Sequence, residues 1–284
     1  MTLGPGARGT IPPVDVIAAM SDLVRSTGLV VTDPVNLRST NNVVVWLAPS
    51  SVVAKISREH ARAEEELRIA RALVDLGAPV VPPIDFGLEQ PVHVGETTVT
   101  FWTYEPQDGV ADLDAAQVAN HLFLLHQKLP TATSRSTLPS YEGPLRAAVR
   151  SLDQVDNAPE LSPEDRSLLR GALVDGMSRL ARSVGSDHVL HGSPHRLNIL
   201  AVNGVPSFID FETVELGPLE WDLAHLEQEV ADHYPAQVDV DVLGVCRVMV
   251  SAATSTWCWE GVDRGPDMRS HAEHHLETVR SVIG

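Results

Sequence analysis

The change from strand patterning to helical patterning near residue 106 is the feature that most constrains the fold of this chain. Before it, short runs rich in valine, threonine and aromatic residues predict strands: GLVVTD, NNVVVWLA, SVVAKIS and TTVTFWTYE. A helical pattern, EHARAEEELRIARALVDLGAP, interrupts these runs and ends at Gly77 and Pro79. After it, apolar residues recur at helical spacing, as in DLDAAQVANHLFLLHQKLP. The sequence therefore predicts an α+β protein whose two lobes are joined by a short hinge.

The expected domain limits follow from this change and from the composition of the N-terminus. Residues 1–13 are rich in glycine and proline, so we expect a flexible segment there. Residues 14–106 would form a β-rich N-terminal lobe, and residues 107–284 a mainly helical C-terminal lobe. With 284 residues the chain is long enough to bury a substantial core.

One small β unit is predicted inside the helical part. The stretch NILAVNGVPSFIDF reads as a hairpin, because Asn203-Gly204 favours a two-residue type I′ turn. Such a turn pairs position 198 with position 209, so Asn198 and Asp210 would lie within about one residue of facing each other. An amide oxygen beside a carboxylate makes a site for a hard cation, of the oxygen-ligand kind that Mg²⁺ prefers.

Composition restricts the partners and the compartment. The formal net charge of −17 argues against a nucleic-acid partner. It is consistent with a cationic small-molecule substrate, and equally with an acidic surface that only keeps the protein soluble. No apolar run approaches the roughly 18 residues of a membrane span, and the N-terminus lacks the apolar core of a signal peptide, so no membrane is expected. Two cysteines, Cys246 and Cys258, are too few for a disulfide framework, which favours a cytoplasmic location.

A lysine and a glutamate in the β-rich part form the first candidate for chemistry. Lys55 ends the predicted strand VVAKIS, in a chain where the 21 basic residues include only two lysines. Glu66 shares its helical stripe with Ala70 and Leu73, so its side chain is predicted to point inward. An unpaired buried charge is costly, and Lys55 is the nearest cation in sequence. The alternatives are a solvated lysine and a surface acid at the edge of the core.

The most specific stretch is HGSPHRLNIL at residues 191–200, followed by SFIDFE and GPLEWDLA. Together with VVAKIS, the helix carrying Glu66, LGAPVVPPI and LLHQKL, in that order, it resembles the aminoglycoside phosphotransferase and choline kinase-like family. The resemblance implies a two-lobed, protein-kinase-like fold. An N-terminal antiparallel β-sheet lobe with one helix would bind ATP or GTP, and a mainly helical C-terminal lobe would carry the catalytic loop and the acceptor pocket.

The resemblance also implies roles for individual residues. Lys55 would bind the α- and β-phosphates while Glu66 holds it, and Asn198 and Asp210 would be Mg²⁺ ligands. His191 and Asp222 would brace the catalytic loop. The hinge would offer backbone groups to adenine from Thr103, Tyr104 and Glu105.

The predicted phosphate-covering loop departs from the family pattern. LRSTNNVVVW contains no glycine. Its polar side chains can still donate hydrogen bonds to phosphate, and asparagine tolerates positive φ. The residues expected to do so are Ser39, Thr40 and Asn41, with Asn42 beside them.

The catalytic loop departs from the pattern more seriously. The family places an aspartate at position 193, where it orients the acceptor hydroxyl, and this chain has Ser193. Losing a general base costs roughly 10²–10⁴-fold in rate. Substitutes are His195 in the same loop, whose alternative role is structural, and Glu212 just beyond Asp210.

Two functions therefore stay open at this point. The first is an ATP- and Mg²⁺-dependent phosphotransferase acting on a hydroxyl of a small molecule such as an aminoglycoside-like compound, an amino sugar or an amino alcohol. The second is a pseudokinase that binds a nucleotide or metabolite as a sensor or partner. The sequence does not choose an acceptor or an oligomeric state.

Overall fold

The computed structural model describes most of the chain as two compact units. The described residues are 14–39, 42–106, 113–181, 188–261 and 266–283. One unit, here called the sheet unit, comprises the described residues of 14–133 and 198–213, and the other, the helical unit, those of 134–197 and 214–283. The predicted flexible segment at residues 1–13 lies outside the described residues, and the predicted lobe boundary near residue 106 stays a prediction.

The sheet unit contains a five-stranded antiparallel sheet in the order β1-β2-β3-β5-β4. Its strands are β1 (Val31–Ser39), β2 (Val43–Pro49), β3 (Val52–Ser57), β4 (Val92–Val94) and β5 (Thr97–Thr103). The antiparallel sheet predicted for the N-terminal part is confirmed. β1 runs further than GLVVTD predicted, through Pro34, because it is an edge strand where a missing N–H is tolerated.

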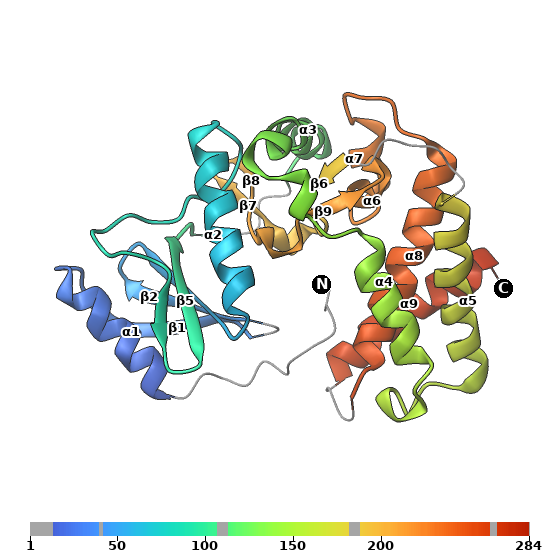
Figure 1. Cartoon of the computed structure of the whole chain (residues 1–284), viewed down its shortest axis with the longest axis horizontal. Helices are drawn as coiled ribbons and strands as arrows, with labels where there is room; N and C mark the ends of the chain where they lie inside the picture. The colour runs from blue at the N-terminus through green and yellow to red at the C-terminus, as the bar shows by residue number, and fades with distance from the viewer. Residues whose placement is uncertain (1–13, 40–41, 107–112, 182–187, 262–265, 284) are drawn as a thin grey trace. The chain divides into compact units, whose positions relative to one another are not determined.

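Helix α1 (Val14–Ser26), which the sequence did not predict, covers one face of this sheet (Figure 1). Met20 and Val24 of α1 share a buried apolar cluster with Ala54 and Ile56 of β3 and with residues of β2 and β5. Because side chains alternate along a strand, Lys55 points to the opposite face. That is the face on which α2 lies.

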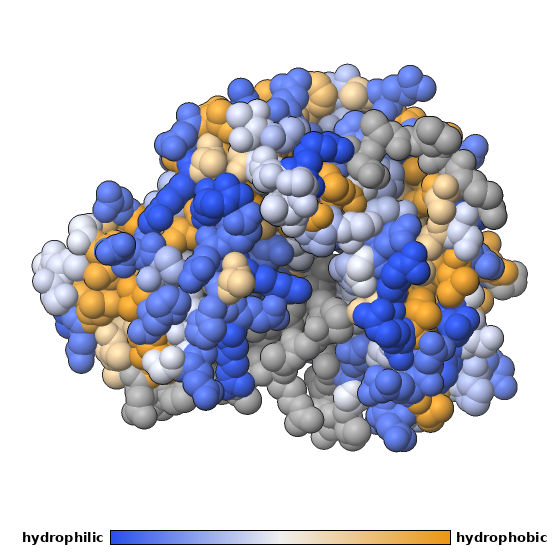
Figure 2. All heavy atoms as spheres, in the orientation of Figure 1, coloured by the Kyte–Doolittle hydropathy of each residue, from blue (hydrophilic) through white to orange (hydrophobic). Residues whose placement is uncertain are grey.

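Helix α2 (His60–Asp75) presents a buried stripe to the sheet and ends at a glycine. The stripe consists of Ala63, Glu66, Leu67, Ile69, Ala70 and Leu73. Gly77 has φ +68°, and the N–H groups of Gly77 and Ala78 donate to the carbonyls of Val74 and Leu73, as in a Schellman motif. Hydrophilic residues cover most of the outward side of α2 in Figure 2.

The predicted hairpin is present. β7 (Ile199–Val202) and β8 (Val205–Phe208) pair antiparallel, with positive φ at both Asn203 (52°) and Gly204 (77°). The N–H of Ile209 donates to the carbonyl of Asn198 at 3.0 Å, so the register is the one that the two-residue turn predicts. Helix α3 (Ala115–Ala132) packs against β8 and buries the predicted face of Val118, Leu122, Leu125 and Leu129.

The helical unit is built from four long helices and a short two-stranded ribbon. Helices α4, α5, α8 and α9 pack against one another around one buried apolar cluster (Figure 1). The elements of this unit are α4 (Glu142–Leu152), α5 (Pro163–Leu180), α6 (Leu219–Leu223), α7 (Gln228–Asp232), α8 (Val240–Trp259), α9 (Pro266–Ile283), β6 (His188–Leu190) and β9 (Glu215–Gly217). Short 3₁₀ turns of the chain are Arg135–Thr137, Val155–Asn157, Arg196–Asn198 and Phe211–Thr213.

Two further findings concern membrane-spanning helices and the cysteines. Among the described residues, no helix combines the length and the apolar composition that crossing a membrane requires. Cys246 and Cys258 are both buried and carry free thiols.

We predict that the hairpin turn depends on Gly204. The Gly204→Ala substitution should lower the free energy of unfolding by about 1 kcal/mol, because alanine resists positive φ. Asn203→Gly keeps that conformation accessible and should change stability by only tenths of a kcal/mol. Urea unfolding of both variants checks this, and equal losses would show that turn geometry is not limiting.

Candidate functional site

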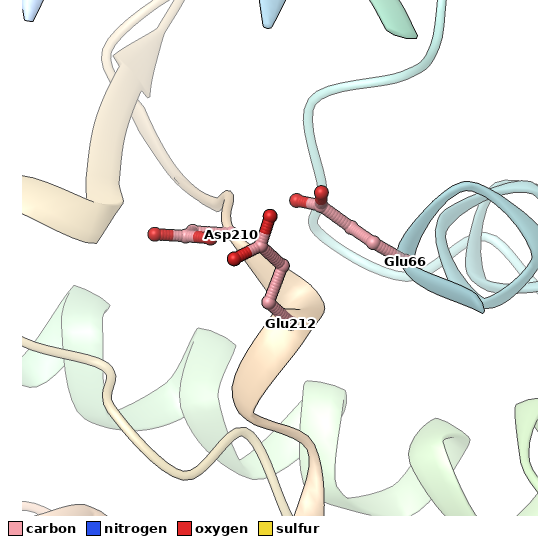
Figure 3. Close-up of side chains that lie close together, drawn as sticks. All are labelled: Glu66, Asp210 and Glu212. Atoms are coloured by element: carbon pink, nitrogen blue, oxygen red, sulfur yellow. The ribbon is translucent and has the colours of Figure 1, made fainter. Parts of the chain in front are cut away.

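Four charged side chains meet inside the sheet unit. The Nζ atom of Lys55 lies 2.8 and 2.9 Å from the carboxylate oxygens of Glu66, 2.8 Å from Oδ1 of Asp210 and 3.0 Å from Oε1 of Glu212. The three carboxylates, which come from α2 and from the segment after β8, lie close together (Figure 3). The pairing of Lys55 with Glu66 that the helical stripe predicted is present in the structure.

Local structure explains why these side chains meet. The strand alternation turns Lys55 toward α2, and the buried stripe of α2 turns Glu66 toward β3. Asp210 follows the hairpin with φ +71°, a left-handed conformation that is unusual for a residue other than glycine. The strained backbone at Asp210 indicates that the surrounding contacts hold this carboxylate in place.

The electrostatics of this cluster are dominated by burial and by the excess of acids. Burial alone lowers the pKa of Lys55, but the charges of Asp210, Glu212 and Glu66 outweigh it and raise the pKa well above its usual value. Burial raises the pKa of Glu66, against the opposing pull of Lys55. A second cation near this cluster would therefore be favourable.

The donor set suits a divalent cation with oxygen preference. One oxygen from each of Glu66, Asp210 and Glu212 lies within 4.8 Å of the others. Asn198 is buried, and its Oδ1 accepts a hydrogen bond from Arg38 at 3.2 Å. Carboxylate and amide oxygens are ligands that Mg²⁺ accepts. The prediction of Asn198 and Asp210 as its ligands therefore stays open, with Glu212 as a further donor.

The residues of the predicted phosphate loop have mixed placements. Ser39 is exposed, and its hydroxyl accepts from the side chain of Asn36 at 2.8 Å. Asn42 donates to Oε1 of Glu212 at 2.8 Å, which ties the start of β2 to the acidic cluster. Thr40 and Asn41 lie outside the described residues.

At the predicted hinge, two backbone donors are already used. The N–H of Thr103 donates to the carbonyl of Pro82, and that of Tyr104 donates to the carbonyl of Ser51. The ring of Tyr104 stacks on Trp46 with centroids 4.1 Å apart. The N–H groups of Thr103 and Tyr104 are therefore not available for the predicted adenine contact.

The predicted catalytic loop lies in the helical unit and is held by Asp222. The carboxylate of Asp222 accepts from the N–H groups of His191 and Gly192, each at 2.8 Å. Asp222 and His191 are fully buried, so this contact fixes the start of the loop to α6. The bracing contact between this acid and the loop, which the resemblance implied, is observed.

Ser193 and His195, the two loop residues that bear on the predicted loss of the general base, have different exposures. Ser193 is only 2% exposed, and its N–H donates to Nδ1 of His191 at 3.4 Å. His195 is partly exposed. The catalytic roles proposed for Ser193, His195, Asp210 and Glu212 stay predictions.

Sequence reasoning missed two features of these sites. Arg38 contacts the predicted metal ligand Asn198, although 160 positions separate them, and no local pattern signals such a contact. Glu215 of β9 is buried and accepts a 2.9 Å hydrogen bond from Nε1 of Trp221. The available signal was that Glu215 is the one acid in a short strand whose other residues are Leu216 and Gly217.

The comparison with family models identifies the class of protein. The model of the phosphotransferase enzyme family, APH, matches residues 34–242. Because this match spans well over half of the sequence, the chain belongs to that family. It includes the acidic cluster and the loop held by Asp222. No curated protein matches the chain at a significant level.

Solved structures agree on the kinase-like fold. Amicoumacin kinase hAmiN in complex with AMP-PNP, Ca²⁺ and Ami has a TM-score of 0.71 at 12% identity, with 95% of this chain and 97% of that chain covered. The GDP and kanamycin complex of APH(2")-IIia has a TM-score of 0.70 at 16% identity, with 95% and 100% covered. A choline/ethanolamine kinase family protein from Mesorhizobium loti has a TM-score of 0.66 at 17% identity, with 93% and 95% covered.

We predict that Lys55→Met destabilises the protein by about 3–5 kcal/mol, because it leaves three close carboxylates without their cation. Added Mg²⁺ should raise the melting temperature of this variant more than that of the wild type, since the metal replaces the lost charge. Lys128→Met, which changes the other lysine, is the control. Thermal unfolding with and without Mg²⁺ checks both points, and an equal shift in all three proteins would refute the second.

We predict that Glu215 makes stability pH-dependent. Burial raises the pKa of Glu215 well above its usual value, and the charge of Asp222 adds to the effect. As pH rises above about 4.5, the unfolded chain loses this proton and the folded protein keeps it, so stability falls by up to about 1.4 kcal/mol per pH unit.

The Glu215→Gln variant should lose this decline while keeping an oxygen acceptor for Trp221. Urea unfolding at pH 5 and pH 8 measures it, with the exposed Glu229→Gln as control. If the decline in the free energy of unfolding persists unchanged in Glu215→Gln, the pH dependence belongs to another group.

Proposed function

We propose that this chain is a small-molecule kinase that transfers the γ-phosphoryl group of ATP or GTP, with Mg²⁺, to a hydroxyl group of its acceptor. The observation that carries this proposal is the buried lysine held by Glu66, Asp210 and Glu212. A buried acid cluster around one lysine is costly to maintain for stability alone, whereas it suits a site that receives a metal and phosphates.

The proposed roles follow from charge and reach. Lys55 would contact the α- and β-phosphates, while Asp210 and Asn198 would hold Mg²⁺, which neutralises charge on the transferring phosphoryl group. In the reaction a bond forms between the acceptor oxygen and the γ-phosphorus, and the bond from that phosphorus to the β–γ bridging oxygen breaks. The nucleoside diphosphate leaves. Most of the rate acceleration in enzymatic phosphoryl transfer comes from positioning of the reactants and from charge compensation.

The proton of the acceptor hydroxyl needs a destination other than Ser193. A serine hydroxyl does not accept a proton near neutral pH. Glu212 already accepts from Lys55 and Asn42, which supports a structural role for it. His195 is partly exposed and follows Ser193 by two residues, so it is the proposed base.

The proposed acceptor is a small hydroxylated amine. The net charge of −17 raises the local concentration of cations around the protein. The similar structures named above include complexes with kanamycin and Ami and a choline/ethanolamine kinase family protein. These similarities support a screen of aminoglycosides, amino sugars and amino alcohols as acceptors, and they do not choose among the three classes.

A second candidate function rests on Ser193. This residue is 2% exposed and stands where the family pattern has its aspartate. A protein that retains the lysine and the acidic cluster but lacks the base could bind a nucleotide or metabolite without turning it over. The pseudokinase is therefore the alternative to be tested beside the kinase.

We predict that Asp210→Asn weakens binding of Mg²⁺ with a non-hydrolysable ATP analogue by about tenfold or more, because the variant loses a metal-binding charge. Isothermal titration measures the affinity, with Asp22→Asn, an exposed acid on α1, as control. Nucleotide binding that is equally strong in the wild type and Asp210→Asn would count against the proposed site.

A measurement of turnover is needed to distinguish a kinase from a pseudokinase. Release of nucleoside diphosphate, measured for the wild type over the acceptor screen and lost in Asp210→Asn, would exclude the pseudokinase. Binding without turnover on any acceptor would support it. In an active enzyme, full activity of His195→Ala would remove the proposed base.

A further inference from the structure

An arginine of the edge strand contacts the predicted metal ligand. Nη1 of Arg38, at the end of β1, donates to Oδ1 of Asn198 at 3.2 Å. Arg38 is partly exposed, and Asn198 is buried beside the hairpin. The contact places a permanent positive charge next to an oxygen that the proposed metal would use.

Lys55 has little capacity left for a phosphate. An ammonium group has three N–H donors. In the structure Nζ of Lys55 faces four carboxylate oxygens within 3.0 Å, from Glu66, Asp210 and Glu212. A triphosphate that contacts Lys55 as proposed would compete with these acids, so a second cationic side chain would strengthen its binding.

The covering loop supplies no glycine for backbone contacts. The sequence between Gly28 and Gly77 contains none, so close approach of the backbone to a phosphate is less easy than in a glycine-rich loop. Side chains must then provide the donors. A guanidinium has five N–H donors and binds phosphate oxygens in pairs.

We propose that Arg38 is a phosphate-binding residue of this site, which leaves Asn198 and binds the terminal phosphate when a nucleoside triphosphate enters. This inference rests on the proposed function, because it needs a nucleotide in the sheet unit. Before the nucleotide binds, Arg38 holds the amide of Asn198. On binding, the same guanidinium neutralises phosphate charge and releases the amide oxygen for the metal.

The proposal predicts different effects on the binding of two ligands. Removal of the guanidinium in Arg38→Met should weaken binding of a Mg²⁺-loaded, non-hydrolysable ATP analogue by about tenfold or more, since hydrogen bonds to charged groups are worth that much. The same variant should bind Mn²⁺ alone at least as tightly as the wild type, because the competing donor and charge are gone. Arg38→Lys keeps the charge without the paired donors, so its affinity for the ATP analogue should lie between those of the wild type and Arg38→Met.

The experiment is titration calorimetry of both ligands with the full chain. The control is Arg62→Met, an exposed arginine of α2 that pairs with Glu59. Melting curves show whether each variant folds. If Arg38→Met does not fold, Arg38→Lys replaces it in the titrations. Weaker triphosphate binding with undiminished Mn²⁺ binding, in Arg38 variants only, supports the proposal.

Two results would overturn it, and they differ from a failure of the proposed function. Triphosphate affinity in Arg38→Met equal to that in Arg62→Met excludes a phosphate contact. Parallel losses for Mn²⁺ and for the triphosphate show that Arg38 only maintains the structure. If the wild type itself binds no nucleotide, the proposed function fails first and the Arg38 proposal fails with it.

Discussion

The cost of burying a charged group is the constraint on which the proposed site depends. Moving an ammonium out of water costs several kcal/mol after relaxation, and only close opposite charges offset it. Lys55 meets this requirement with three carboxylates, drawn from α2 and from the segment after β8. Strand, helix and hairpin must therefore keep their relative positions, because a displaced carboxylate would leave an uncompensated charge. The structural frame of the sheet unit and its proposed chemistry share one set of contacts.

The acidic cluster also explains why a second cation matters. Three acids around one lysine leave an excess of negative charge, which raises the pKa of Lys55 and favours any further positive group. Mg²⁺ and Arg38 are the two groups proposed above for that role. The chain thus has the lysine and the acids that are proposed above to handle phosphate charge. Ser193 stands at the position that the family resemblance assigns to the acceptor proton, and in phosphoryl transfer that step contributes less than charge compensation does.

Local patterns predicted those features whose physics is local. The stripe of α2, the end at Gly77 and the type I′ turn at Gly204 each depend on a few neighbouring residues, and the structure confirms them. The extension of β1 through Pro34 was not predicted, because proline is acceptable only on an edge strand and the strand order is not visible in sequence. Helix α1 was missed as well, although its Met20 and Val24 complete the core beneath the sheet.

For the site, the sequence by itself determined the pairing of Lys55 with Glu66, the register that brings Asn198 next to Ile209, and the family to which the chain belongs. These follow from periodicity, from turn geometry and from an ordered set of motifs. Only the tertiary structure decided that Glu212 shares the lysine and that Arg38 reaches Asn198. Side chains more than 150 positions apart meet through packing, and no local propensity records which of many arginines will arrive at a given oxygen.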